Sequence, residues 1–232
     1  MIALKRISLL LLLAGLYLRP SHSHAQEFGV SFSFFMPRNG YFSTPVSPLS
    51  LRGIGFDLNR FVSIESGFTL YRIPGMNVTE MPFETKEPIM GPFFSILVPL
   101  DLVLTFGSQS SYFSLKGGGF TYTNFDNRVN YGNLDRALVD YTGLEVVNSQ
   151  VQFQNNFGLG YHFGVEYTFY INQQIGLSFG GEYFVGGSKL AFTGSYTGAS
   201  TAGDLESVPI DYPDSRLDFF GLELSIGVIF SP

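Results

Sequence analysis

The segment from residue 220 to 230 alternates between two kinds of side chain. Gly221, Glu223, Ser225 and Gly227 are small or charged, and every even-numbered position around them is apolar. Successive strand side chains point to opposite faces, so this segment predicts a strand with one apolar face and one polar face. Such a strand is typical of the wall between lipid and a polar lumen. The apolar positions are Phe220, Leu222, Leu224, Ile226, Val228 and Phe230.

The first 25 residues have the three regions of a secretory signal peptide. Lys5 and Arg6 precede a twelve-residue apolar run over 7–18, and Ser23 and Ala25 are small residues before a cut at Gln26. The alternative is a membrane anchor, but a spanning helix needs roughly 20 apolar residues. We therefore expect residues 1–25 to be a cleaved signal peptide and residues 26–232 to form a single barrel domain.

The charge balance bears on the kind of partner. Residues 1–25 hold three of the 13 basic residues and no acid, so the remaining chain has 10 basic and 19 acidic residues, formally −9. An acidic chain is a poor binder of nucleic acid, which we do not expect as a partner. Charged residues are only 14% of the chain, and there is no cysteine, which excludes disulfides and thiolate chemistry.

Period-two alternation divides the chain into strands. Eight segments show it, and we predict an all-β fold, an eight-stranded antiparallel up-and-down transmembrane β-barrel. The expected strands are 28–36, 50–58, 61–73, 92–106, 111–123, 154–170, 174–190 and 216–230.

The connections alternate in length, which orients the barrel. Segments 37–49, 74–91, 124–153 and 191–215 are long, and those between the other strands are tight turns. Outer-membrane barrels have short periplasmic turns and long extracellular loops. We expect a bacterial outer-membrane location with periplasmic termini and extracellular long loops.

Two places in the predicted strands suggest irregularity. Pro99 removes a ladder hydrogen bond and predicts a bulge in the strand 92–106. Gly117, Gly118 and Gly119 break the alternation of the strand 111–123, so that Phe120 and Tyr122 are expected to move to the lipid face through a second bulge.

A soluble eight-stranded lipocalin is the main structural rival, because it also alternates and follows a signal peptide. The polar face of the predicted strands favours the membrane barrel. That face is mostly Gly, Ser and Thr with Lys116 as its one lysine in the strand centres, too little charge for a water-facing exterior. Small side chains do suit the narrow lumen of an eight-stranded barrel.

Several of these features together carry a family resemblance. The signal peptide, the segment Phe94–Leu100, the glycine-rich strand after it and the aromatic terminal strand resemble the small outer-membrane β-barrel family of Bacteroidetes, including PorT-like proteins. The resemblance implies insertion by the outer-membrane barrel-insertion machinery, with the apolar positions of 220–230 as the insertion signal. A PorT-like role would imply assistance to a secretion system.

Charges on the polar face are the candidates for chemistry. Alternation directs seven of them into the lumen, and four lie at a similar height above the tight turns, so we expect a polar network around Lys116 that fills the lumen. The alternative is a small gated ion channel or cation site, because acids outnumber the lysine. The lumen residues are Glu65, Asp101, Lys116, His162, Glu166, Glu182 and Glu223.

An enzymatic role is the other alternative, as an outer-membrane enzyme acting on lipid or peptide. His162 is the only histidine beyond the signal peptide, and Glu166 is about 13 Å away by strand rise, too far to orient it. No serine is selected by any pattern, and no phosphate-binding glycine loop is present. We expect no enzyme activity, no cofactor and no metal site.

The long segments carry whatever recognition there is. Residues 133–141 place Leu134, Leu138 and Tyr141 on one helical face, with an Asn before them as a cap and Gly143 as a stop, although an irregular loop is the alternative. Acids in loops 74–91 and 191–215 are solvated or bind cations or basic partners. The expected function is a monomeric, non-enzymatic envelope barrel that anchors, adheres or assists secretion. Its expected partners are outer-membrane lipid, lipopolysaccharide, the insertion machinery and secretion components.

Overall fold

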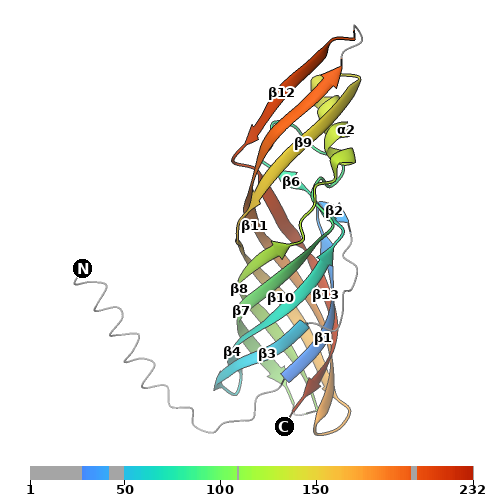
Figure 1. The fold of residues 1–232 in the computed structure, drawn as a ribbon. Helices are drawn as coiled ribbons and strands as arrows, with labels where there is room; N and C mark the ends of the chain where they lie inside the picture. The colour runs from blue at the N-terminus through green and yellow to red at the C-terminus, as the bar shows by residue number, and fades with distance from the viewer. Residues whose placement is uncertain (1–27, 42–49, 109, 200–202, 232) are drawn as a thin grey trace, which may run out of the picture.

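The computed structural model describes residues 28–41, 50–108, 110–199 and 203–231. Eight antiparallel strands form a closed ring, which confirms the predicted barrel (Figure 1). The ring closes between the first and last strands, with Phe28 opposite Phe230 and Pro37 opposite Gly221. The strands of the ring are β1 (Phe28–Pro37), β3 (Ser50–Asn59), β4 (Val62–Ile73), β7 (Phe93–Gly107), β8 (Ser111–Phe125), β10 (Gly158–Tyr170), β11 (Ile175–Ala199) and β13 (Arg216–Phe230). The predicted signal peptide lies outside the described residues.

The two ends of the barrel differ as the loop lengths predict. The tight turns after β3, β7 and β10 lie at the end where β1 begins and β13 finishes (Figure 1), which we call the turn end. The long segments lie at the opposite end, the loop end. Short strands there add local pairings: β2 (Gly40–Tyr41) pairs with β5 (Gly75–Met76), and β6 (Val78–Thr79) pairs with β13.

One predicted loop is instead a strand that rises beyond the barrel. β11 continues to Ala199, where β9 (Val146–Asn155) and β12 (Leu205–Tyr212) flank it as a three-stranded sheet (Figure 1). Residues 191–215 are rich in Gly, Ser and Thr, which hid their alternation, yet Phe192 and Ile210 are buried in a core. The predicted strand 154–170 is also divided, because its first residues belong to β9. We call β9, β12 and the upper part of β11 the extension.

A helix packs on the extension. α2 (Tyr131–Thr142) has the side chain of Asn130 as its N-cap and Gly143, at φ 74°, as its left-handed C-cap. Leu134 and Leu138 are buried, whereas Tyr141 is 54% exposed, so only part of the expected apolar face is covered. The helical alternative for this segment is therefore the correct one, with its start slightly earlier than the apolar face indicates.

The outer wall of the barrel is apolar. Along β10, Leu159, Tyr161, Phe163, Val165 and Tyr167 are each between 44% and 69% exposed, and β7 and β13 repeat the pattern. Soluble monomers rarely expose a contiguous apolar patch above a few hundred Å². An outward apolar face around the ring is the reverse of a lipocalin, whose exterior must face water. No helix in the described part of the chain has the length and hydropathy needed to cross a membrane.

Aromatic side chains fill the lumen near the loop end. All six members of this aromatic plug are at most 4% exposed, and the rings of Phe35 and Phe219 stack with centroids 4.6 Å apart. Glycines on β10 make room for them, since a Cβ at Gly158 would strike the Tyr122 ring. The plug consists of Phe35, Tyr71, Phe120, Tyr122, Phe184 and Phe219.

Both predicted bulges are wrong. Register is continuous along β8, so Phe120 and Tyr122 keep their inward parity and join the plug instead of facing lipid. The register of β7 is also unchanged on either side of Pro99. The register of β3 against β4 shifts instead, between Leu51 and Ile54, where Gly53 has φ 79°, and again between Asp57 and Asn59.

Candidate functional site: the charged layer of the lumen

Arg52 lies in the lumen, although the alternation along β3 predicts that it faces lipid. Counting back from the outward residues Ile54 and Phe56 sends Arg52 to the lipid face. The bulge at Gly53 adds one residue to β3 and reverses the parity before it, so Arg52 points inward and its side chain is only 16% exposed. The sequence signal for this bulge is an arginine that strict alternation would place against hydrocarbon, next to a glycine.

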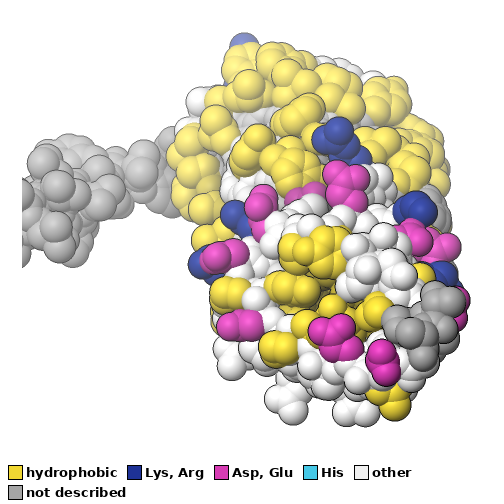
Figure 2. All heavy atoms as spheres, turned by 90° about the horizontal axis from the view of Figure 1, so that it is seen from above, with side chains coloured by type: hydrophobic (Ala, Val, Ile, Leu, Met, Phe, Trp, Pro, Cys, Tyr) yellow, Lys and Arg dark blue, Asp and Glu magenta, His cyan; other side chains and the backbone are white. Residues whose placement is uncertain are grey.

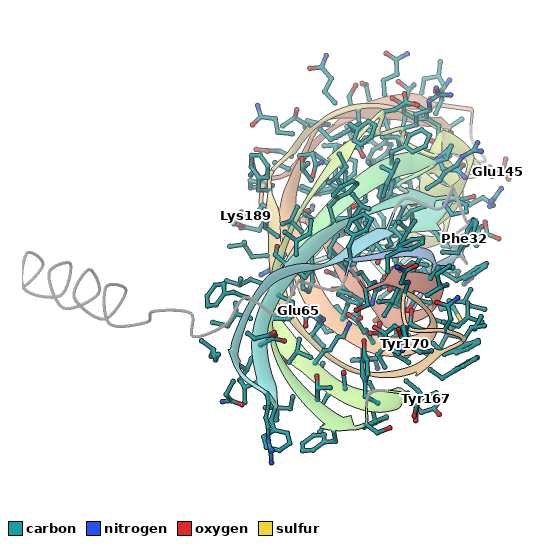
Figure 3. The ribbon with its side chains drawn as sticks, turned by 90° about the horizontal axis from the view of Figure 1, so that it is seen from below. Phe32, Glu65, Glu145, Tyr167, Tyr170 and Lys189 are labelled. Carbon is teal, nitrogen blue, oxygen red and sulfur yellow. The ribbon has the colours of Figure 1, made fainter. Side chains whose placement is uncertain are left out.

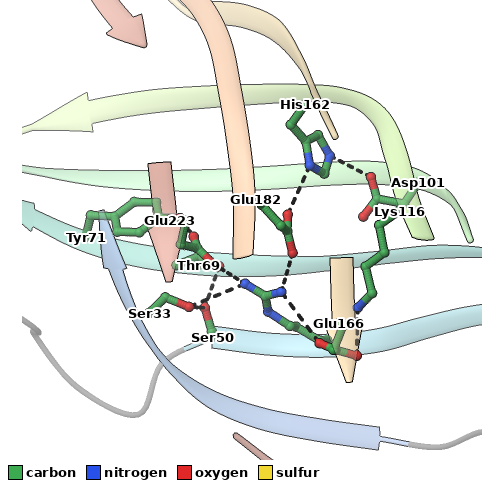
Figure 4. Close-up of polar contacts among 11 residues, drawn as sticks. Ser33, Ser50, Thr69, Tyr71, Asp101, Lys116, His162, Glu166, Glu182 and Glu223 are labelled. Carbon is green, nitrogen blue, oxygen red and sulfur yellow. Dashed lines mark hydrogen bonds and ion pairs between the residues drawn. The ribbon is translucent and has the colours of Figure 1, made fainter. Parts of the chain in front are cut away.

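Arg52 contacts carboxylates on three other strands, and these acids, Glu166, Glu182 and Glu223, are labelled in Figure 4. It donates hydrogen bonds to Glu182 on β11 and to Glu223 on β13, and it lies 3.9 Å from Glu166 on β10. Glu182 and Glu223 are directly opposite each other across the β11–β13 ladder. Two facing carboxylates repel each other, so the guanidinium placed against both is what allows both to be buried.

Hydroxyl groups complete the surroundings of Glu223 and Arg52. The Tyr71 hydroxyl donates to Glu223, which is 1% exposed. A chain of hydroxyl groups also lies in the lumen, with O–O distances of 3.0 and 2.5 Å between Ser33, Ser50 and Thr69. Arg52 Nη2 reaches the Ser33 hydroxyl at 3.4 Å. The guanidinium is thus held between acids and hydroxyls from several strands.

Lys116 forms the second cationic centre of the layer. Its Nζ lies 3.0 Å from Glu166 Oε1, and both side chains are at most 7% exposed. Glu65 is half-buried, accepts a hydrogen bond from Ser63 at 2.7 Å and pairs across the ladder with Asp101. Glu166 therefore lies between Lys116 and Arg52 and connects the two centres.

His162 lies between two carboxylates. Its Nδ1 is 3.0 Å from Glu182 and its Nε2 is 2.6 Å from Asp101. The ring also stacks on Phe184 of the plug, with centroids 4.9 Å apart and planes inclined by 5°. Both ring nitrogens face acids, so neither is left to activate a serine, and this arrangement argues against a nucleophilic site at His162.

All seven lumen residues that the alternation indicates therefore lie together with Arg52. The layer holds five carboxylates, Arg52, Lys116 and His162, so formal acids outnumber the two permanent cations. Among the described residues no group of three or more His, Cys, Asp or Glu side chains is arranged to hold a metal ion. The expected network around Lys116 has two cationic centres, and Arg52 contacts more of its acids than Lys116 does.

The lumen is open below the charged layer and filled above it. A cavity of about 520 Å³ lies at the turn end, the end that faces the viewer in Figure 3, and its lining includes Arg52, Glu65, Lys116 and Glu166. Above the layer, Tyr71 and Phe184 belong to the plug and also contact Glu223 and His162. The charged layer is thus the floor of the plug, and its lower side lines the cavity at the turn end.

The loop end presents a different surface. Figure 2, the view onto this end, shows exposed hydrophobic side chains with acidic ones around them. Phe83, Tyr141 and Tyr212 form an aromatic cluster there, with the Phe83 ring 5.3 Å from that of Tyr141 and 6.0 Å from that of Tyr212. Burial, together with the nearby Tyr141 and Tyr196, raises the pKa of Tyr212 above its ordinary value.

Comparison with known proteins gives similarity in fold. No protein-family model and no curated protein sequence matches the chain. Among solved structures, OprG, an outer membrane protein of Pseudomonas aeruginosa, matches 90% of this chain and 96% of its own with a TM-score of 0.54 at 11% identity. A major outer membrane protein of Thermus thermophilus covers 89% and 99% with a TM-score of 0.41 at 13% identity. Ail, the attachment invasion locus protein of Yersinia pestis, covers 88% and 95% with a TM-score of 0.34 at 8% identity. The chain has the fold of OprG, an eight-stranded outer-membrane barrel.

Proposed function

We propose that this protein is a non-catalytic, integral outer-membrane barrel whose lumen is sealed and whose extension is displayed on the cell surface. Its termini and tight turns face the periplasm. It acts by presenting the extension and α2 to other molecules rather than by conducting solutes or transforming a substrate.

The membrane location is supported by the outer wall. Leu224 and Ile226 on β13 are 47% and 45% exposed, and Leu100 and Leu102 on β7 are 63% and 50% exposed. Each exposed apolar residue gains free energy by leaving water, at about 25 cal/mol per Å². The short turns at one end and the long segments at the other are the arrangement of an outer-membrane barrel with its extension outside.

The aromatic plug above the charged layer is the observation that carries the proposal. The six plug residues lie in ring contact with one another across the lumen, and Phe120 and Phe184 meet edge to face at 5.2 Å. Directly below, Arg52 connects β3, β10, β11 and β13 through its carboxylates. An ion entering from the turn end meets first a salt-bridged layer and then a buried aromatic layer, and both oppose its passage.

Single-channel recording in planar bilayers tests this directly. The purified barrel is expected to give no conductance steps, and the triple variant Phe35→Ala/Phe184→Ala/Phe219→Ala is expected to give steps. The matched control Leu100→Ala/Leu102→Ala/Leu224→Ala removes side chains from the outer wall and should remain silent. Regular conductance steps from the unaltered protein would favour the gated-channel alternative and contradict the proposal.

We also propose that the protein assists a secretion system, as a PorT-like protein would. The aromatic cluster near Tyr141 and the exposed Leu205, at 78%, are surface features on which an envelope partner could dock. Co-purification from native membranes should recover secretion components with the unaltered protein and lose them with Tyr141→Ser/Leu205→Ser. Recovery of the insertion machinery alone from both proteins would remove the secretion role and leave the sealed barrel.

A further inference from the structure

Three cations project from the outer wall at the loop end of neighbouring strands. Lys189 on β11 and Arg216 on β13 are directly opposite each other in the ladder. Arg38 follows β1, and its backbone N–H donates to Phe220 of β13 at 2.7 Å. All three residues are exposed and share the outward parity of the apolar wall below them. We call Arg38, Lys189 and Arg216 the basic patch.

The ladder brings these side chains into one patch. Asp218 lies two residues from Arg216 on the same face, and both Arg38 and Arg216 lie near its carboxylate. Gly187, opposite Asp218, leaves the wall bare there, and an ideal Cβ at Gly187 would be 3.6 Å from Arg216 Nη2. The Arg216 guanidinium therefore lies along the wall instead of extending straight into solvent. Asp214, 85% exposed and 3.9 Å from Lys189, is the second acid of the patch.

The height of the patch relates it to lipid. On each strand, the outward side chains become apolar a short distance toward the turn end. Met36 is the next outward residue below Arg38 on β1. Phe220 follows Asp218 on β13, and Val185 follows Gly187 on β11. The wall thus changes from apolar to cationic within about four residues, or roughly 13 Å of strand. In a membrane, this change falls where hydrocarbon ends and phosphorylated headgroups begin.

The opposite side of the barrel differs at this end. There the rings of Phe94 and Phe125 stack on the outer wall with centroids 5.4 Å apart, and Phe125 is 44% exposed. Aromatic rings suit the uncharged part of the interface, whereas three cations suit phosphate. Arg72 on β4, exposed and directly opposite Phe94, adds a cation to the aromatic side, so the two sides differ in how many cations they gather.

We propose that Arg38, Lys189 and Arg216 form a binding site for the phosphate groups of a phosphorylated outer-leaflet lipid such as lipid A. The inference rests on the proposed membrane location. The acyl chains lie against the apolar wall below the patch, the two guanidinium groups provide paired N–H donors to phosphate oxygens, and Lys189 contributes a point charge. Asp218 is the acid on the same face of β13 that lies nearest in sequence to Arg216.

The test uses the full-length barrel purified in a zwitterionic detergent and titrated with bisphosphorylated lipid A, with retained lipid counted by native mass spectrometry. Each cation near an anionic headgroup contributes about fivefold in affinity, so Arg38→Gln/Lys189→Gln/Arg216→Gln should weaken binding by roughly 100-fold. The control Lys86→Gln/Arg128→Gln/Arg136→Gln removes the same charge from exposed ion pairs elsewhere and should change binding less than about twofold.

Two further probes identify the ligand chemistry. Dephosphorylated lipid A should bind the unaltered protein as weakly as lipid A binds the patch variant. Inorganic phosphate should not displace lipid A, because it lacks the acyl chains. Equal losses in the two triple variants, or full displacement by inorganic phosphate, would overturn the site. A protein that fails to insert into membranes at all would instead refute the proposed location, so the two failures are distinguishable.

Discussion

Removing the Arg52 guanidinium is expected to destabilise the barrel strongly. Arg52→Met leaves Glu182 and Glu223 facing each other without their shared cation, and both are at most 5% exposed. Breaking a buried ion pair by deleting one partner costs about 3–5 kcal/mol. The cavity at the turn end admits water to Arg52, which is 16% exposed, so we expect a loss near the lower end of that range, about 3 kcal/mol.

The measurement is guanidinium-induced unfolding in detergent micelles. The chain has no tryptophan, so far-ultraviolet circular dichroism and the gel mobility of unheated samples report the folded fraction. Arg128→Met is the matched control, because its pair with Asp126 is exposed at 3.3 Å and contributes about 0–1 kcal/mol. Adding Glu223→Gln to Arg52→Met should recover about 1–2 kcal/mol by removing one stranded charge. Equal losses for Arg52→Met and Arg128→Met would refute the role given to Arg52.

Three other substitutions test separate parts of the structure. Gly158→Ala drives a Cβ into the Tyr122 ring and should cost about 1–3 kcal/mol, whereas Gly119→Ala, whose Cβ would have its nearest neighbour at 3.6 Å, should be tolerated; equal unfolding midpoints would contradict the plug packing. Asn130→Ala should weaken the start of α2 by about 1 kcal/mol, seen as faster hydrogen exchange there with the barrel unchanged. Leu224→Lys should cost about 2–4 kcal/mol in lipid bilayers, and a neutral result would place the outer wall in water.

The strands were predictable because their alternation is nearly complete. In β13, β10 and β7 the outward positions are apolar over most of the span, so one periodic signal fixes both the strand and its inner face. The lumen acids followed from the same parity. The continuation of β11 did not, because Gly194 and Gly198 interrupt the face that carries Phe192 and Tyr196, so that the alternation between faces is weak although Phe192 is buried.

The local effects of glycine on the backbone account for the other differences between the predicted and the observed strands. Parity reverses at Gly53, and since sequence alternation assumes an unbroken strand, Arg52 was missed although it contacts three of the predicted lumen acids. Conversely, the glycine run in β8 suggested a bulge, but glycine there permits close approach, with Gly118 against the Leu100 carbonyl. Whether a glycine bends a strand or makes room for a neighbour depends on the strand beside it.

The segment that holds α2 shows a third reason why the sequence alone did not determine the structure. The capping residues Asn130 and Gly143 are visible in sequence, but a helix this short is marginal alone. Its stability comes from β9, where Asp135 accepts hydrogen bonds from the Ser149 N–H at 2.9 Å and the Ser149 hydroxyl at 2.5 Å. That partner strand was itself unpredicted, so the helix could be proposed only as one of two alternatives.

Cysteine labelling of whole cells tests the central claim that the barrel crosses the outer membrane and displays its extension outside. The chain has no cysteine, so Ser207→Cys on β12 and Gln173→Cys in the turn between β10 and β11 each carry a single thiol at an exposed site. A membrane-impermeant maleimide should label Ser207→Cys on intact cells and Gln173→Cys only after the outer membrane is permeabilised. Labelling of Gln173→Cys but not Ser207→Cys on intact cells, or recovery of both in the soluble fraction, would contradict the account.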